Sequence, residues 1–208
     1  MKFDNEFKDE SDYSAVYEES IIIIGPPAVG KSTTAEALST ILQRTHLPLD
    51  TYVNKKMEGE WAPDPYDAGA MEEMYLETIR DLISIGVKSN DPFIMDFGST
   101  QSALDIGENF FKLKQMLAPF KNVVFLRPAL DLQKAEKTMT KRIKQNRLYG
   151  RGMIKRGKQL LKGGQNAVLA KIIIDTENKT QKQVTEQVFK QTGNARFLPN
   201  IYTIENTK

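Results

Sequence analysis

Short apolar runs, each about the length of a strand, recur along the chain. They are IIIIG from residue 21, LPLDTYV from 47, PFIMD from 92, NVVFL from 122 and KIIID from 171. Most are continuous rather than alternating, which is typical of strands that are buried on both faces of a parallel sheet. The pattern predicts five parallel strands.

Apolar residues at helical spacing separate these runs. The stripes consist of Ala35 to Leu42, Met71 to Ile83, Ile106 to Leu117, Leu132 to Ile143 and Val184 to Val188. Connections between parallel strands place helices on both faces of the sheet. The alternation therefore predicts a three-layer α/β/α domain, and no internal repeat or linker divides the 208 residues.

Four segments do not fit this alternation. Residues 58–70 are acidic and contain Trp61, whereas residues 145–166 are glycine-rich and basic. Long connections in compact domains often form lids or binding loops, so we expect two mobile loops and a lid over 141–166. We expect residues 1–19 to be an acidic, peripheral N-terminal extension and 194–208 to be a peripheral tail of one domain spanning 1–208.

Composition excludes several kinds of site. The chain has a net charge of +2, no cysteine and one histidine, His46, which we interpret as an ordinary loop residue. Disulfides, thiolate nucleophiles and multi-histidine metal sites are therefore excluded. Because no apolar run approaches the roughly 20 residues of a membrane helix and the start is acidic, we expect a cytoplasmic protein.

Charge is distributed unevenly. Residues 1–20 contain seven acids and two lysines, whereas residues 137–174 contain eleven Lys or Arg and no Asp or Glu. We expect this basic stretch to meet an anion.

Residues 25–32, GPPAVGKS, match the phosphate-loop pattern G-x-x-x-x-G-K-[ST]. The motif follows a buried type of strand and opens a helix, which is its required context. Gly25 and Gly30 allow a tight turn, Lys31 adds a positive charge, and the following helix offers its positive end. We predict that ATP binds here through Lys31, Ser32, Thr33 and the turn residues Gly25, Pro26, Pro27, Ala28, Val29 and Gly30.

Two carboxylates are candidates for the chemistry. Asp96 ends the third apolar run, and with the Ser32 hydroxyl we predict it to bind Mg²⁺. Asp50 ends the second predicted strand, and the carboxyl ends of parallel strands face the ligand crevice. Either Asp50 or Asp96 is thus a candidate catalytic base. The alternative for both is that they cap turns.

The order of elements resembles the shikimate kinase family, within the nucleoside monophosphate kinase-like group of P-loop kinases. Residues 20 to 190 carry the likeness, through IIIIGPPAVGKSTTAEALSTIL, LPLDTYVNKKM, FIMDFGST, NVVFLRPALDLQKAEKTMTKR and KIIIDTENKTQKQVTEQV. The resemblance implies a sheet in the order 2-3-1-4-5, a basic lid over ATP, and transfer of the γ-phosphoryl group to a hydroxyl of a small molecule.

The resemblance also implies roles for residues in the second half of the chain. Arg142 would lie against the adenine, and Asp175 and Thr176 would hold its edge through backbone groups. Arg147 would act in catalysis, closing over the phosphates together with Arg151. Arg127 follows the fourth strand, and either it reaches the site or its role is structural.

The acceptor half departs from the family pattern. Where the family has Asp-x-Asp, this chain has Asp50-Thr51-Tyr52, and Phe97-Gly98-Ser99 replaces a triple glycine. The family's arginine after the acceptor loop has no counterpart other than Arg80. We therefore expect an acceptor other than shikimate.

The leading hypothesis is an ATP- and Mg²⁺-dependent small-molecule kinase, monomeric or homodimeric, without a membrane or nucleic-acid partner. One alternative is a slow ATPase or nucleotide-dependent switch that acts through a partner. Another is a polynucleotide kinase or nucleic-acid-binding ATPase that uses the basic run 141–162, where Tyr149 is the only aromatic residue available for stacking. A GTPase is disfavoured because Asn54-Lys55-Lys56-Met57 lacks the aspartate of a guanine-reading Asn-Lys-x-Asp motif.

Overall fold

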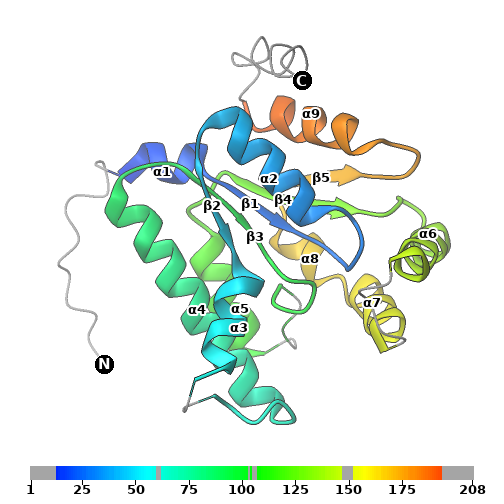
Figure 1. Ribbon diagram of the computed structural model, residues 1–208, viewed down its shortest axis with the longest axis horizontal. Coiled ribbons are helices and arrows are strands. Elements are labelled where there is room, and N and C mark those ends of the chain that lie inside the picture. Colours follow the sequence, from blue (N-terminus) through cyan, green and yellow to red (C-terminus); the bar gives the residue numbers. More distant parts are fainter. Residues whose placement is uncertain (1–12, 60–61, 103, 105–106, 147–151, 194–208) are drawn as a thin grey trace.

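One parallel sheet forms the centre of the computed structural model, which describes residues 13–59, 62–102, 104, 107–146 and 152–193. Its five strands lie in the order β2-β3-β1-β4-β5 (Figure 1). They are β1 (Ile21–Ile24), β2 (Thr45–Pro48), β3 (Phe93–Asp96), β4 (Asn122–Arg127) and β5 (Ile172–Asp175). The predicted strand order is confirmed.

Helices connect the strands. In the described part of the chain they are α1 (Ser14–Glu19), α2 (Lys31–Leu42), α3 (Leu49–Met57), α4 (Ala68–Ser89), α5 (Glu108–Leu117), α6 (Leu132–Gln145), α7 (Gly152–Gly163), α8 (Gln165–Leu169) and α9 (Gln181–Gln191).

The four isoleucines of β1 show how the sheet is covered. Ile21 and Ile23 pack in one apolar cluster with residues of α2 and α9, whereas Ile22 and Ile24 pack in another with residues of α4 and α5. All four are fully buried. Successive side chains of a strand point to opposite faces, so both faces of the sheet are covered and the three-layer prediction is confirmed.

The second strand is shorter than predicted and ends at Pro48, so the prediction that Asp50 ends a strand was wrong. Proline has no N–H to continue the ladder, and Leu49 and Val53 are buried four residues apart on α3. Asp50 lies in the first turn of this helix.

The basic segment 145–166 is not an irregular loop, because much of it forms α7 and the start of α8. Gly157 lies at a buried position of α7, where an added Cβ would come 2.5 Å from the sulfur of Met139 on α6. A glycine in the packed face conceals the helical period, since periodicity is recognised by large apolar residues.

The acidic N-terminal segment is partly integrated into the core, contrary to expectation. Val16 of α1 is fully buried, and the ring of Tyr17 contacts Phe120 edge-on at a centroid distance of 5.1 Å. The Ser20 hydroxyl accepts a hydrogen bond from the backbone N–H of Phe93 at 3.1 Å. Residues 1–12, Trp61 and the predicted tail 194–208 lie outside the described residues.

The packing of α4 on β3 predicts a sharp difference between two glycines of the same helix. A Cβ on Gly86 would meet the Phe93 ring at 2.2 Å, whereas one on Gly69 would make only an ordinary contact at 3.4 Å. We expect Gly86→Ala to lower the free energy of unfolding by about 1–3 kcal/mol through overpacking. Gly69→Ala, the matched control, should be neutral or stabilising by up to about 1 kcal/mol. Urea unfolding of both variants checks this, and equal effects would contradict it.

Candidate functional site

The phosphate loop is a tight turn between β1 and α2. Gly25, Ala28 and Gly30 have positive φ angles of 150°, 58° and 95°. A Cβ on Gly25 would lie 2.5 Å from the backbone oxygen of Leu126 on β4, so only glycine fits there. The loop therefore closes directly against the sheet, and α2 begins at Lys31.

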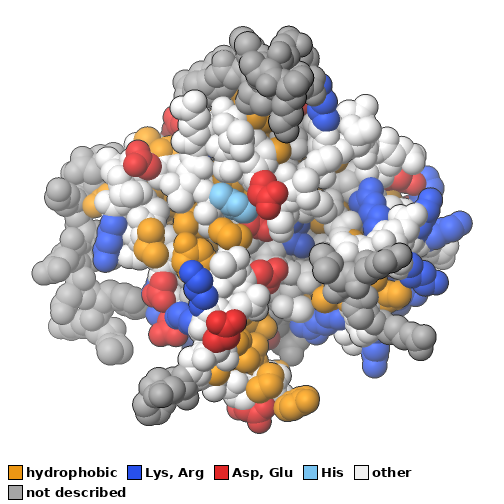
Figure 2. Space-filling model, viewed as in Figure 1, with side chains coloured by type: hydrophobic (Ala, Val, Ile, Leu, Met, Phe, Trp, Pro, Cys, Tyr) orange, Lys and Arg blue, Asp and Glu red, His pale blue; other side chains and the backbone are white. Residues whose placement is uncertain are grey.

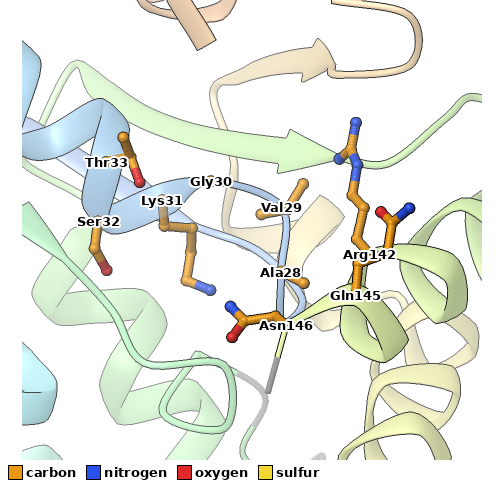
Figure 3. Close-up of a pocket in the computed structure, with 9 residues that line it drawn as sticks. All are labelled: Ala28, Val29, Gly30, Lys31, Ser32, Thr33, Arg142, Gln145 and Asn146. Atoms are coloured by element: carbon orange, nitrogen blue, oxygen red, sulfur yellow. The ribbon is translucent and has the colours of Figure 1, made fainter. Parts of the chain in front are cut away.

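A cavity of about 500 Å³ lies beside this loop (Figure 3). The loop forms one side of it and the C-terminal end of α6 forms the other. The lining residues are Ala28, Val29, Gly30, Lys31, Ser32, Thr33, Arg142, Gln145 and Asn146. The structure thus brings Arg142 to the loop, and its contact with adenine stays a prediction, whereas Gly25, Pro26 and Pro27 are buried and do not line the cavity.

Lys31 is the buried cation of the site. Its Nζ donates a hydrogen bond to the Pro26 carbonyl at 3.0 Å. Burial lowers the pKa of Lys31 to about 8, although the negative charges of Asp50 and Asp96 oppose this shift. The desolvated ammonium is therefore held beside two carboxylates.

Asp96, at the end of β3, accepts two hydrogen bonds. Ser32 Oγ donates to its Oδ2 at 2.6 Å, and His46 Nε2 lies 2.6 Å from its Oδ1. Burial raises the pKa of Asp96, but these two hydrogen bonds lower it below its ordinary value, so the carboxylate is ionised.

His46 is therefore not the ordinary loop residue that we predicted. It lies on β2, whose register pairs it with Ile94 on β3 and pairs Pro48 with Asp96. Residues two apart on a strand share a face, which places His46 on the same face as Asp96. No local sequence signal marks this contact, because the two residues are 50 positions apart.

The donor atoms fit Mg²⁺. Ser32 and Asp96 supply hard oxygen ligands, which this ion prefers, and it is commonly held by one or two carboxylates together with substrate phosphates. Among the described residues, no group of three or more His, Cys, Asp or Glu could hold a metal ion. These two side chains thus suit an ion that binds together with a nucleotide.

Asp50 is exposed and does not line this cavity, and its Oδ1 accepts a hydrogen bond from Gln101 Nε2 at 2.7 Å. The same Gln101 accepts a hydrogen bond from the Gly98 backbone N–H through its Oε1. A Cβ on Gly98 would lie 1.9 Å from Asp50 Oδ1, so this backbone approaches the carboxylate closely. Sequence reasoning missed Gln101, since it belongs to no motif.

Phe97 replaces the first glycine of the family's triple glycine, but its side chain does not add to the surface of an acceptor site. The Phe97 ring is fully buried in the apolar core. Ser99, by contrast, lies near α7, where its Oγ is 3.8 Å from the sulfur of Met153. The loop after β3 therefore brings Gly98 and Gln101 to Asp50, and Ser99 to α7.

Two arginines contact the residues that end β5 and follow it. Arg142 donates from both terminal nitrogens to Thr176, to its Oγ1 and its carbonyl, each at 2.8 Å. Arg127 forms a two-point ion pair with Asp175, with donor–acceptor distances of 2.7 and 3.2 Å. The contact of Arg127 with Asp175 supports its structural role, and an adenine contact of Asp175 and Thr176 stays a prediction.

Gln181 is a second residue that sequence reasoning missed. From the start of α9 its Nε2 donates to Thr34 Oγ1 at 2.6 Å, and Thr34 Oγ1 donates to the Gly30 carbonyl at 2.8 Å. A Cβ on Gly30 would lie 2.8 Å from Gln181 Oε1. Helix α9 therefore packs on the end of the phosphate loop, although Gln181 and Thr34 are 147 residues apart.

The basic segment is partly neutralised by the fold, so its charges are not all unopposed as the sequence suggested. Lys158 and Lys162 of α7 lie 3.5 and 3.6 Å from the carboxylate of Glu136 on α6. Other Lys and Arg side chains gather on the surface near α6 and α7 (Figure 2). Arg147 and Arg151 lie outside the described residues.

Arg80 does not face the phosphate loop. It lines a separate hollow of about 640 Å³ on α4, with Lys56, Glu73, Glu77 and Lys112 among the other lining residues. This hollow shares no lining residue with the cavity at the phosphate loop.

Across the described ranges, no helix has the length and apolar character needed to cross a membrane.

The strand order and the phosphate loop define a P-loop nucleotide-binding fold of the kinase type. A family model described as AAA domain matches residues 21–161, about two thirds of the chain. The chain therefore belongs to this family. No curated protein matches it.

Solved structures support the same class of fold. The shikimate kinase of Bacteroides thetaiotaomicron has a TM-score of 0.58 at 16% identity, over 85% of this chain and 98% of that one. A gluconokinase from Sinorhizobium meliloti 1021 has a TM-score of 0.54 at 16% identity, over 90% and 97%. The thymidylate kinase of Candida albicans has a TM-score of 0.52 at 16% identity, over 86% and 92%. At such identities the likeness concerns the fold.

The low pKa of Lys31 predicts that this residue destabilises the nucleotide-free protein. A depression from 10.5 to about 8 corresponds to a cost of about 3 kcal/mol while the lysine is charged in both states. We expect Lys31→Met to raise the free energy of unfolding at pH 7 by up to about 3 kcal/mol and to abolish ATP binding.

The gain in free energy of unfolding that Lys31→Met gives over the wild type should decrease as the pH rises. Between about pH 8 and 10.5 the native lysine is neutral while the unfolded one is charged, so unfolding takes up a proton and the wild type gains stability. Guanidinium unfolding from pH 7 to 10 checks this, with exposed Lys137→Met as the control. A stability difference that does not change with pH would contradict the prediction.

Proposed function

We propose that the protein is an ATP-dependent phosphotransferase that moves the γ-phosphoryl group of ATP to a hydroxyl of a small molecule other than shikimate. One observation carries the proposal: the exposed carboxylate of Asp50 is oriented by Gln101 next to the phosphate-loop site. Asp50 lies near enough to Lys31 for its charge to raise the pKa of that lysine. A base beside a phosphate cradle is what transfer to a hydroxyl requires.

The surroundings of the two carboxylates favour different roles for them. Both oxygens of Asp96 are occupied, by Ser32 and His46. Asp50 uses only Oδ1, and its Oδ2 has no hydrogen-bond partner among the described residues. We assign the proton-accepting role to Asp50 Oδ2, and we assign Asp96 and Ser32 to the magnesium ion of the ATP complex.

The reaction follows from these assignments. The phosphate loop and Lys31 hold the phosphates of ATP, and Asp50 Oδ2 accepts a hydrogen bond from the acceptor hydroxyl. The hydroxyl oxygen forms a bond to the γ-phosphorus while its proton passes to Asp50, and the bond from this phosphorus to the β,γ-bridging oxygen breaks to release ADP. When bound, magnesium neutralises phosphate charge. Catalysis is otherwise mostly positioning and electrostatic stabilisation.

The acceptor side supports a substrate different from that of shikimate kinases. Tyr52 replaces the family's second acid, and its half-buried ring packs against the apolar core. Arg80, the one candidate for the family's acceptor-loop arginine, lines the hollow on α4 instead. The described side chain that hydrogen-bonds Asp50 is the neutral Gln101.

The proposal predicts that Asp50→Asn separates catalysis from ATP binding. The protein is incubated with ATP, Mg²⁺ and a panel of sugars, nucleosides, hydroxylated metabolites and antibiotics, and phosphorylated products are detected by mass spectrometry. We expect one acceptor class to be phosphorylated by the wild type. Asp50→Asn should lower kcat by about 10²–10⁴-fold with little change in ATP affinity. Asp91→Asn, an exposed aspartate before β3, is the matched control and should resemble the wild type.

Three further measurements test the alternatives. ATP hydrolysis that no acceptor stimulates and that Asp50→Asn leaves intact would favour an ATPase or nucleotide-dependent switch. Binding of an oligonucleotide that weakens strongly with salt would favour a nucleic-acid partner. ATP binding that survives Lys31→Ala unchanged would contradict the assignment of the phosphate loop.

A further inference from the structure

The carboxylate of Asp96 is oriented by hydrogen bonds from two different elements. Ser32 of α2 donates to Oδ2 and His46 of β2 donates to Oδ1, each over 2.6 Å. Because an ionised carboxylate only accepts, the proton of each bond must come from the partner, and the histidine therefore carries hydrogen on Nε2. The two bonds thus approach the carboxylate through different oxygens.

One hydrogen bond would not fix this group. The terminal torsion of an aspartate side chain has broad energy wells, so a carboxylate held through one oxygen can still turn about its Cβ–Cγ bond. A second bond to the other oxygen restricts this rotation and fixes the plane. His46 can supply it because the β2–β3 register places His46 on the same face as Asp96.

Stabilisation of the fold alone is a poor explanation for the buried hydrogen bond between His46 and Asp96. The side chain of Asp96 is 6% exposed and that of His46 is 18% exposed, so both polar groups are largely desolvated. Asp96 pairs with Ile23 on β1, next to buried apolar residues such as Ile94. Apolar residues at such positions are often at least as stabilising as a buried polar pair. Orientation of the carboxylate is the benefit that an apolar pair could not provide.

We propose that His46 is a positioning residue that fixes the Asp96 carboxylate so that Oδ2 faces Ser32 and the magnesium ion that accompanies ATP. The inference rests on the proposed function, because it concerns the same metal–nucleotide site. His46 touches neither nucleotide nor metal and acts only through Asp96. Hydrogen-bond partners of metal-binding carboxylates commonly change metal affinity by 10–100-fold when they are replaced.

The test measures metal binding without turnover. Mn²⁺ serves as the probe, and its dissociation constant is measured by electron paramagnetic resonance in the presence of a non-hydrolysable ATP analogue. We expect His46→Leu to raise this constant about tenfold. His46→Gln, which keeps an N–H donor at the end of a side chain of similar reach, should remain close to the wild-type value. Thr45→Val, an exposed neighbour on β2, is the matched control.

The affinity for the same nucleotide is also measured in excess chelator, where no free metal ion is present. This measurement distinguishes a loss of carboxylate positioning from damage to the fold. We expect this metal-free affinity to be unchanged in all three variants, with thermal unfolding confirming that each is folded. Unchanged Mn²⁺ affinity in His46→Leu would overturn the inference and leave the proposed function intact. Equal losses in His46→Leu and His46→Gln, or an equal loss of metal-free affinity, would also overturn it. If the wild type binds no nucleotide through Lys31, both proposals fail.

Discussion

A carboxylate that is almost completely removed from water must have its oxygens satisfied by the protein, and Asp96 meets this requirement with donors from two other segments. Ser32 brings the start of α2 to it, and His46 brings β2. The position of the phosphate loop relative to β2 and β3 is thereby tied to one charged group. Lys31, buried next to this carboxylate, feels its charge, so cation, hydroxyl and carboxylate form one electrostatic unit.

Burying these charged groups costs free energy, and packing against the sheet holds them in place. Fully buried isoleucines of β1 lead directly into the loop, and the neighbouring β4 leaves no room for a Cβ at Gly25. On its other side the loop is held by Gln181 through Thr34. Packing on both sides holds the loop in a conformation with positive φ angles and a desolvated lysine, neither of which is favourable alone. Apolar burial elsewhere compensates for this local cost.

The fold could be predicted from the sequence because continuous apolar runs and a phosphate-loop motif are local signals. The motif also pointed to Lys31 and Ser32, which line the cavity. Contacts that depend on strand register were not readable: His46 is 50 residues from Asp96, and Gln101 is 51 residues from Asp50. A glycine and a proline made the sequence-based prediction of secondary structure wrong in two places. Gly157 conceals the helical period of α7, and Pro48 ends β2 although the apolar run continues beyond it.

The surroundings of Asp50 and Asp96 differ in a way that bears directly on their chemistry. A carboxylate whose two oxygens both accept hydrogen bonds is a weak base, because each bond favours the ionised form. A carboxylate that is exposed and held through one oxygen keeps the other free for a substrate hydroxyl. Environment, rather than residue type, thus favours opposite tasks for two chemically identical side chains. Gly98 adds to this division, since its backbone approaches Asp50 so closely that the carboxylate and the loop after β3 are positioned together. If Asp50 accepts the proton as proposed, the acceptor would therefore lie against this loop, whose Ser99 is near α7.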